Sequence, residues 1–242
     1  MKVLAIGNSY SCDGTRYLWE IAKSVGKTIT VANLFIGGCP LRKHYVNALD
    51  DAKAYELYFN GIGTGFRVSI KEALISNDWD VVTLQQASRD SMNFDTYLPY
   101  LDFLAQQIHL YAPKAKIYIH QTWAYTEAQS KVLGFDSHAA MLQAILPAYE
   151  QAKERISADG MIPDGEVMGA LKECREESEI YRDAIHASHG MGRYALALTW
   201  FATLTGKDIA EVPFDNFDAP VTKEQMDAAK EIVARVIASH AN

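Results

Sequence analysis

Three residues stand in an order and at a spacing that suit nucleophilic catalysis. Ser9 follows the apolar run from Val3 to Ile6, which predicts a short strand, a tight turn and then a helix. The free amides at the start of such a helix can face an anion. Asp183 and His186 stand three residues apart before a late apolar segment, and a carboxylate at that spacing can reach the far nitrogen of the imidazole. These residues predict a serine nucleophile, a histidine base and an orienting aspartate.

Each of these residues also has an ordinary structural interpretation. Ser9 suits a helix cap or a turn, and the lipase-type elbow Gly-x-Ser-x-Gly is absent because Ser11 occupies the second glycine position. Taken alone, Asp183 and His186 suit a surface carboxylate and a capping histidine equally well. A nucleophilic serine needs a base, and the base needs an orienting carboxylate, so the catalytic interpretation requires a fold that brings all three together.

Strands and helices alternate along the chain. Short apolar runs predict five strands, over residues 2–6, 28–35, 80–84, 116–119 and 161–162. Apolar residues at helical spacing predict the intervening helices, and Thr222 opens the final one with a capping box. Residues 55–59 and 66–68 are interpreted as a small separate hairpin. The alternation predicts one α/β domain over residues 1–242, a flavodoxin-like three-layer α/β/α sandwich with a doubly wound, mostly parallel, five-stranded sheet.

In a sheet of this kind the loops that follow the strands meet at one edge, where ligands bind. The polar residues directly after the predicted strands are Asn8-Ser9, Gly37-Gly38, Gln85-Gln86 with Ser88, and His120-Gln121. This set contains a nucleophile, backbone amides, carboxamides and an imidazole. It contains no phosphate-binding loop. The pair His186 and His189 lacks a third ligand nearby, so we expect no zinc site.

Composition and charge exclude several classes of partner. The formal net charge is -7 and the longest basic cluster is Arg42-Lys43, so we expect neither a nucleic-acid partner nor an anionic lipid surface. The cysteines Cys12, Cys39 and Cys174 lie far apart and are interpreted as small hydrophobic residues, not as a disulfide framework or a metal clamp. We expect no cofactor and a small neutral substrate.

The sequence also bears on location. No apolar run approaches the roughly 18 residues that a membrane-spanning helix needs, so we expect no membrane insertion. The segment after Met1 is too short to be the apolar core of a signal peptide. We therefore expect a cytoplasmic protein, or a periplasmic or secreted one if a leader was removed before Met1.

Taken together, the motifs resemble those of the SGNH (GDSL-type) hydrolases. The segment Gly7-Asn8-Ser9 resembles the nucleophile block of that superfamily, Gly37-Gly38 its glycine block, and Asp183-x-x-His186 its terminal block. The resemblance spans nearly the whole chain. It is closest to a bacterial branch of unassigned function marked by GNSYS, GGC, TLQQAS and a terminal D-x-x-H. It implies a serine esterase with Ser9, Asp183 and His186 as its catalytic triad and no cofactor.

The third block departs from the superfamily pattern. Gly-x-Asn-Asp is usual there, and the asparagine amide donates to the oxyanion, whereas this chain has Leu84-Gln85-Gln86-Ala87-Ser88. The resemblance implies an oxyanion hole built from the amides of Ser9 and Gly38 with one more donor. We predict Gln86 as that donor, with Ser88 and Gln85 as alternatives.

The substrate is expected to be a small-molecule or glycan ester. The superfamily resemblance favours a short acyl group on a sugar, which makes a carbohydrate deacetylase the leading prediction. Gln85, His120 and Trp123 follow predicted strands and are candidate substrate-binding residues, although Trp123 equally suits packing under a loop. Two alternatives stay open: a thioesterase, lysophospholipase or acyltransferase using the same triad, and a non-catalytic, flavodoxin-shaped binding module in which Ser9 is a turn residue.

Overall fold

The computed structural model describes residues 1–240, so the last two residues of the predicted 1–242 domain lie outside it. Five strands are parallel, and they are β1 (Lys2–Gly7), β2 (Thr30–Phe35), β5 (Val81–Leu84), β6 (Lys116–His120) and β7 (Gly160–Ile162). Every one of them corresponds to a predicted strand. Their spatial order is β2-β1-β5-β6-β7, which is the flavodoxin-like order.

The predicted hairpin differs from expectation because it joins the sheet. Strands β3 (Tyr55–Phe59) and β4 (Ile62–Val68) pair with each other, and β3 runs antiparallel to β2. The sheet therefore has seven strands, in the order β4-β3-β2-β1-β5-β6-β7, and remains mostly parallel. The free edge of β2 offers unpaired backbone groups, and the hairpin satisfies them.

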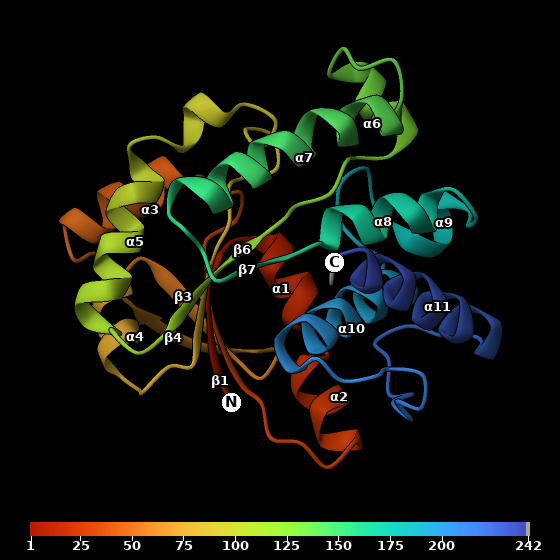
Figure 1. Cartoon of the computed structure of the whole chain (residues 1–242), viewed down its shortest axis with the longest axis horizontal. Helices are drawn as coiled ribbons and strands as arrows, with labels where there is room; N and C mark the ends of the chain where they lie inside the picture. The colour runs from red at the N-terminus through yellow and green to blue at the C-terminus, as the bar shows by residue number, and fades with distance from the viewer. Residues whose placement is uncertain (241–242) are drawn as a thin grey trace.

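Helices cover both faces of the sheet (Figure 1). One layer contains α1 (Ser9–Thr15), α2 (Leu18–Ser24), α8 (Asp164–Lys172), α9 (Glu177–Ile180), α10 (Met191–Thr205) and α11 (Lys223–Ser239). The other contains α3 (Leu41–Leu49), α4 (Ile70–Ile75), η1 (Phe94–Tyr97), α5 (Tyr100–Tyr111), α6 (Glu127–Val132) and α7 (His138–Arg155). The three-layer α/β/α sandwich is thus confirmed. No helix within residues 1–240 is long and apolar enough to cross a membrane.

The helix α10 is the centre of its layer. It packs against α1, α2, α8 and α11, and most of its residues are buried. This burial explains why the strongly apolar sequence of α10 has no polar face. The packing also places α10, which follows the Asp183–His186 segment in the chain, against α1, the helix that Ser9 begins.

Helix α3 was not predicted, because two of its three buried positions are polar. The buried residues are Leu41, His44 and Asn47, so apolar spacing alone does not reveal the helix. His44 Nδ1 lies 2.9 Å from the Tyr55 hydroxyl. Burial lowers the pKa of His44 to about 3, so the imidazole stays neutral in the folded protein.

We expect this histidine to make stability fall as the pH is lowered. The folded-state pKa of about 3 lies below the unfolded value of about 6.5, so the unfolded chain binds the extra proton between these limits. Its contribution to the free energy of unfolding should fall by up to about 1.4 kcal/mol per pH unit on going from pH 6.5 towards 3. Urea unfolding at pH 7 and pH 5 measures this. A His44→Gln variant should show a shallower pH dependence, and an unchanged one would contradict the assignment.

Candidate active site

Ser9 lies at the switch point of the doubly wound sheet. It begins α1 directly after β1, between the carboxyl ends of β2 and β5, where the chain connections leave in opposite directions. Asn8 caps the helix, with its side-chain oxygen accepting a hydrogen bond from Tyr10 N at 3.0 Å. The cap fixes the turn that presents the Ser9 hydroxyl, and α1 begins at Ser9 itself.

The three predicted catalytic residues lie together in one hydrogen-bonded chain. Ser9 Oγ is 2.9 Å from His186 Nε2, and His186 Nδ1 is 2.8 Å from Asp183 Oδ2. Because Asp183 accepts a hydrogen bond from Nδ1–H of His186, the lone pair of Nε2 is directed at the serine hydroxyl. The Asp183 side chain is 47% exposed and that of His186 is 22% exposed, so the site is open to solvent.

The backbone of the D-x-x-H segment holds Asp183 in its ionised form. Asp183 Oδ1 accepts hydrogen bonds from Ile185 N at 2.9 Å and His186 N at 2.8 Å. Partial burial acts to raise the pKa of Asp183, but these amide bonds and the His186 ring outweigh it and hold the pKa below its ordinary value. The carboxylate is therefore charged at neutral pH.

A stacked pair of aromatic side chains holds the segment from Asp183 to His186 in place. Tyr10 and Trp123 stack with ring centroids 4.0 Å apart. The Tyr10 hydroxyl and Trp123 Nε1 both donate to Ile185 O, at 2.8 and 3.0 Å. Trp123 is fully buried, so it packs under the loop that carries His186.

A buried carboxylate ties the nucleophile helix to that segment. Asp13, 1% exposed, accepts two hydrogen bonds from Arg182 Nη1, at 2.9 and 2.8 Å, and one from Arg193 Nε at 2.8 Å. Arg182 directly precedes Asp183 in the chain. Sequence reasoning missed this contact, because the two partners are 169 residues apart and no local pattern links them.

Replacing Asp13 by alanine should destabilise the protein strongly, because two partly buried arginines would lose their shared acceptor. We expect the free energy of unfolding to fall by about 3–5 kcal/mol, measured by urea unfolding. Asp102→Ala is the matched control, since it removes an aspartate that accepts three hydrogen bonds from the half-exposed Arg155, and it should cost about 1 kcal/mol or less. Equal losses in both variants would contradict this account.

The backbone amides of Ser9 and Gly38 lie in the segments that directly follow β1 and β2. Within residues 1–240, the N–H groups of Ser9 and Gly38 donate to no protein acceptor. Gly38 lies in the exposed turn after β2 with φ +59°, a conformation that glycine adopts without strain. Both amides are therefore available to a ligand.

Gln86 is not available, which corrects the prediction that it donates to an oxyanion. Its Nε2 gives hydrogen bonds to Thr96 O and Thr96 Oγ1, each at 3.0 Å. Its Oε1 accepts from Leu41 N and Ala87 N, at 2.9 and 2.8 Å. The side chain is 1% exposed, and both of its amide hydrogens are donated to Thr96. The alternative Ser88 is 8% exposed, and its hydroxyl lies 2.8 Å from that of Tyr125.

Because Gln86 anchors the loop, Gln86→Ala should affect stability more than chemistry. It leaves the buried amide of Leu41 without its acceptor, so the free energy of unfolding should fall by about 1–3 kcal/mol. We expect kcat for an acetyl ester to fall less than tenfold, well short of the about 10²–10³ that loss of an oxyanion donor produces. Steady-state kinetics together with a thermal melt distinguishes a structural role of Gln86 from a role as oxyanion donor. A loss of kcat of about 10²-fold in a stable variant would show that Gln86 is a donor after all.

The predicted substrate-binding residues are also corrected. Gln85, His120 and Trp123 are at most 1% exposed, so none of them offers a surface to a substrate. Gln85 lies between Asn8 and His120 instead, bonded to both. Polar residues at a strand end can point into the interior as well as into the ligand edge, and sequence position does not distinguish the two.

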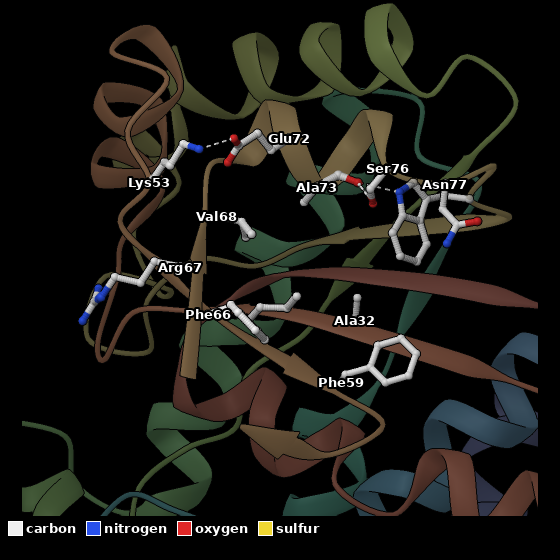
Figure 2. A pocket seen from close by; sticks show the side chains of 12 residues that line it. Ala32, Lys53, Phe59, Phe66, Arg67, Val68, Glu72, Ala73, Ser76 and Asn77 are labelled. Carbon is white, nitrogen blue, oxygen red and sulfur yellow. Dashed lines mark hydrogen bonds and ion pairs between the residues drawn. The ribbon is translucent and has the colours of Figure 1, made fainter. Parts of the chain in front are cut away.

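A separate pocket lies away from these residues. It has a volume of about 510 Å³ and is formed between the β3–β4 hairpin and α4 (Figure 2). Phe59 and Phe66 line it, and Lys53 Nζ pairs with Glu72 Oε1 at 2.6 Å on its wall. Ser9, Asp183 and His186 do not line this pocket. Across residues 1–240, no group of three His, Cys, Asp or Glu side chains is arranged to hold a metal ion.

The chain is similar to several solved structures. A DUF4886 family protein from Bacteroides uniformis is 30% identical with a TM-score of 0.92, over 100% of this chain and 96% of that one. A candidate SGNH hydrolase from Slackia heliotrinireducens is 23% identical with a TM-score of 0.60, over 84% and 98%. A mutant of an acetyl-xylooligosaccharide esterase from Geobacillus Stearmophilus is 14% identical with a TM-score of 0.51, over 90% and 97%. No curated protein matches the chain.

The flavodoxin-like strand order and these structural likenesses show that the chain has the same α/β/α fold as the SGNH hydrolases, as the motifs predicted. The chain belongs to the family described as Domain of unknown function (DUF4886), whose model matches residues 2–236.

Proposed function

We propose that this protein is a serine esterase that removes short acyl groups, acetyl above all, from a carbohydrate or glycan ester. The observation that carries the proposal is the hydrogen-bonded chain Ser9–His186–Asp183, with distances of 2.9 and 2.8 Å. A turn serine or a capping histidine needs no such chain, whereas general-base activation of a hydroxyl does.

In the proposed reaction, His186 Nε2 takes the proton of Ser9 as Oγ attacks the ester carbonyl carbon. Asp183 holds the ring and stabilises the imidazolium that forms. The tetrahedral intermediate then collapses, its bond to the alcohol oxygen breaks, and His186 gives its proton to that oxygen. A water molecule, deprotonated by His186, hydrolyses the acyl-serine ester and restores the free enzyme.

The amides of Ser9 and Gly38 are the proposed donors to the oxyanion. They are free of protein acceptors within residues 1–240, and fixed N–H dipoles at the developing charge lower the barrier most in a preorganised site. With Gln86 committed to Thr96, the proposed hole consists of these two amides.

The acetyl-carbohydrate preference draws on the structural neighbours. They include the acetyl-xylooligosaccharide esterase described above and a carbohydrate esterase family 3 protein from Talaromyces cellulolyticus, which has a TM-score of 0.56. The partly exposed triad suits a bulky sugar on the alcohol side. The formal net charge of -7 favours a neutral substrate over an anionic one.

The test is a fluorophosphonate probe, which phosphonylates an activated serine as fluoride leaves, followed by mass mapping of the labelled residue. We expect a single label on Ser9, and hydrolysis of p-nitrophenyl acetate faster than of the octanoate. Folded protein that takes no label would favour the binding module. Label on Ser9 with a clear optimum at long acyl chains would favour a lipase or thioesterase using the same triad.

A further inference from the structure

A chain of buried polar side chains that takes no part in the proposed chemical steps begins at the turn carrying Ser9. Its members are each at most 1% exposed, and they are Asn8, Gln85, His120, Asp164 and Trp200. Burying this many polar groups is costly unless each finds its partner. The contacts of the chain therefore indicate what it holds in place.

At the Ser9 end, the chain joins two turns. Asn8 Oδ1 accepts from Tyr10 N at 3.0 Å and from Gln85 Nε2 at 2.9 Å, and Asn8 Nδ2 donates to Cys39 O at 3.2 Å. Asn8 precedes Ser9, and Cys39 follows Gly38. One carboxamide thus connects the two segments whose amides are the proposed oxyanion donors.

At the other end, the chain is anchored between two helices. His120 Nδ1 lies 3.2 Å from Gln85 Oε1, and His120 Nε2 lies 2.7 Å from Asp164 Oδ2. Trp200 Nε1 donates to the same oxygen at 2.9 Å. Asp164 Oδ1 is buried without a partner among the described residues. Burial raises the pKa of Asp164 despite the bonds from His120 and Trp200.

These contacts determine where the protons lie. The Tyr10 amide can only donate, so it faces the oxygen of Asn8, and Gln85 must then turn its NH₂ towards that oxygen. Gln85 Oε1 consequently faces His120, which must carry a proton on Nδ1. A second proton lies between His120 Nε2 and Asp164 Oδ2. The His120–Asp164 pair carries no net charge. Rotating the side-chain amide of Asn8 or Gln85 by half a turn would break its hydrogen bonds.

Two glycines allow the chain to lie against the nucleophile elements. A Cβ atom on Gly7 would lie 2.5 Å from Gln85 Oε1, and one on Gly14 would lie 2.6 Å from Trp200 Nε1. Both distances are shorter than real contacts of a Cβ. A side chain at Gly14 would therefore displace Trp200, and one at Gly7 would displace both Gln85 and Ser11.

We propose that the chain Asp164–His120–Gln85–Asn8 is a positioning network that holds the Ser9 and Gly38 amides aimed at one point. The inference rests on the proposed function, because it assigns these residues the task of preorganising the oxyanion donors of that site. Such donors act only when held within about 0.5 Å of the productive geometry, and a misplacement of about 1 Å can cost about 10²-fold in rate.

The test compares two buried glutamines. Gln85→Met nearly keeps the side-chain volume and removes the Nε2 and Oε1 groups that bond to Asn8 and His120. Gln121→Met is the matched control, because Gln121 is also fully buried and its Oε1 accepts a hydrogen bond from Glu166 N at 3.0 Å, outside the network. We expect Gln85→Met to lower kcat for p-nitrophenyl acetate by about 10–100-fold with KM nearly unchanged. In Gln85→Met, the rate of Ser9 phosphonylation should fall by a similar factor. In Gln121→Met, kcat and the phosphonylation rate should each fall by no more than about threefold.

The outcomes separate the network from the function. If the wild-type protein is not labelled at Ser9, the proposed function fails. If the wild type is labelled and Gln85→Met reacts as fast, or Gln121→Met loses as much, only the network is overturned. Should Gln85→Met fail to fold, Gln85→Glu replaces it. A protonated glutamic acid can donate to Asn8 and accept from His120 as glutamine does, so its kcat relative to wild type should rise as the pH is lowered. A ratio that is flat with pH would overturn the network.

A readout independent of activity is the proton on His120. In protein with ¹⁵N-labelled histidine, we expect a slowly exchanging Nδ1–H signal from His120 that is retained in Gln121→Met and lost or shifted in Gln85→Met. An unprotonated Nδ1 in the wild-type protein would overturn the proton assignment and the proposal with it.

Discussion

Replacing Ser9 by alanine is expected to abolish ester hydrolysis while leaving the fold intact. The change removes only Oγ, whose one hydrogen bond within residues 1–240 joins it to His186 Nε2. We expect kcat for p-nitrophenyl acetate to fall by at least about 10³ and towards about 10⁶, as losses of a nucleophile do in serine hydrolases. The fluorophosphonate label should disappear as well.

The control is Ser24→Ala, which removes an exposed serine hydroxyl from the end of α2 and should leave kcat unchanged. Circular dichroism and a thermal melt verify that both variants fold. A well-folded Ser9→Ala protein that retains more than about a tenth of the wild-type kcat would overturn the serine mechanism, because no other residue can take over the attack at that position.

Asp183→Asn should produce the second-largest loss. Asparagine can keep the bonds from Ile185 N and His186 N through its oxygen, but its NH₂ then faces His186 Nδ1 in place of Oδ2. The ring must shift its proton to Nε2, so the nitrogen facing Ser9 becomes a donor and cannot accept the serine proton. The corresponding change in a buried triad lowers kcat by about 10⁴. Because Asp183 is 47% exposed, we expect about 10²–10⁴.

Asp208→Asn is the control, since Asp208 is also exposed and accepts a hydrogen bond from the amide two residues later, Ala210 N, at 2.9 Å. It should leave kcat unchanged within about twofold. If Asp183→Asn is equally mild, the aspartate does not set the tautomer of His186. The proposed role of Asp183 would then be wrong even if Ser9 remains the nucleophile.

The elements around Ser9 and His186 were predictable because their signals are local. An apolar run ending in Gly7-Asn8-Ser9 specifies strand, turn and helix cap within a few residues. The capping box at Thr222 is formed as its residue types indicate. The alternation of such elements predicted the five parallel strands, and the chirality and packing rules of parallel sheets then leave few topologies.

Most of the errors concern long-range partners. The hairpin of β3 and β4 joins the sheet because one edge of β2 is free to pair with it. No residue within the hairpin indicates that this edge is free. Gln86, predicted at the oxyanion, is bound by Thr96. Helix α3 escaped notice because it buries His44 and Asn47 in place of apolar residues.

The sequence by itself determined which residues can carry the chemistry, since residue type and local spacing decide whether a nucleophile, a base and an acid are present. The tertiary structure alone decided what surrounds them. Asp13 meets Arg182 across 169 positions of the chain, and Gln85 meets Asn8 across 77. The reason is physical: a buried polar group must find a partner wherever the folded chain supplies one, and that choice is made by packing, which local sequence does not encode.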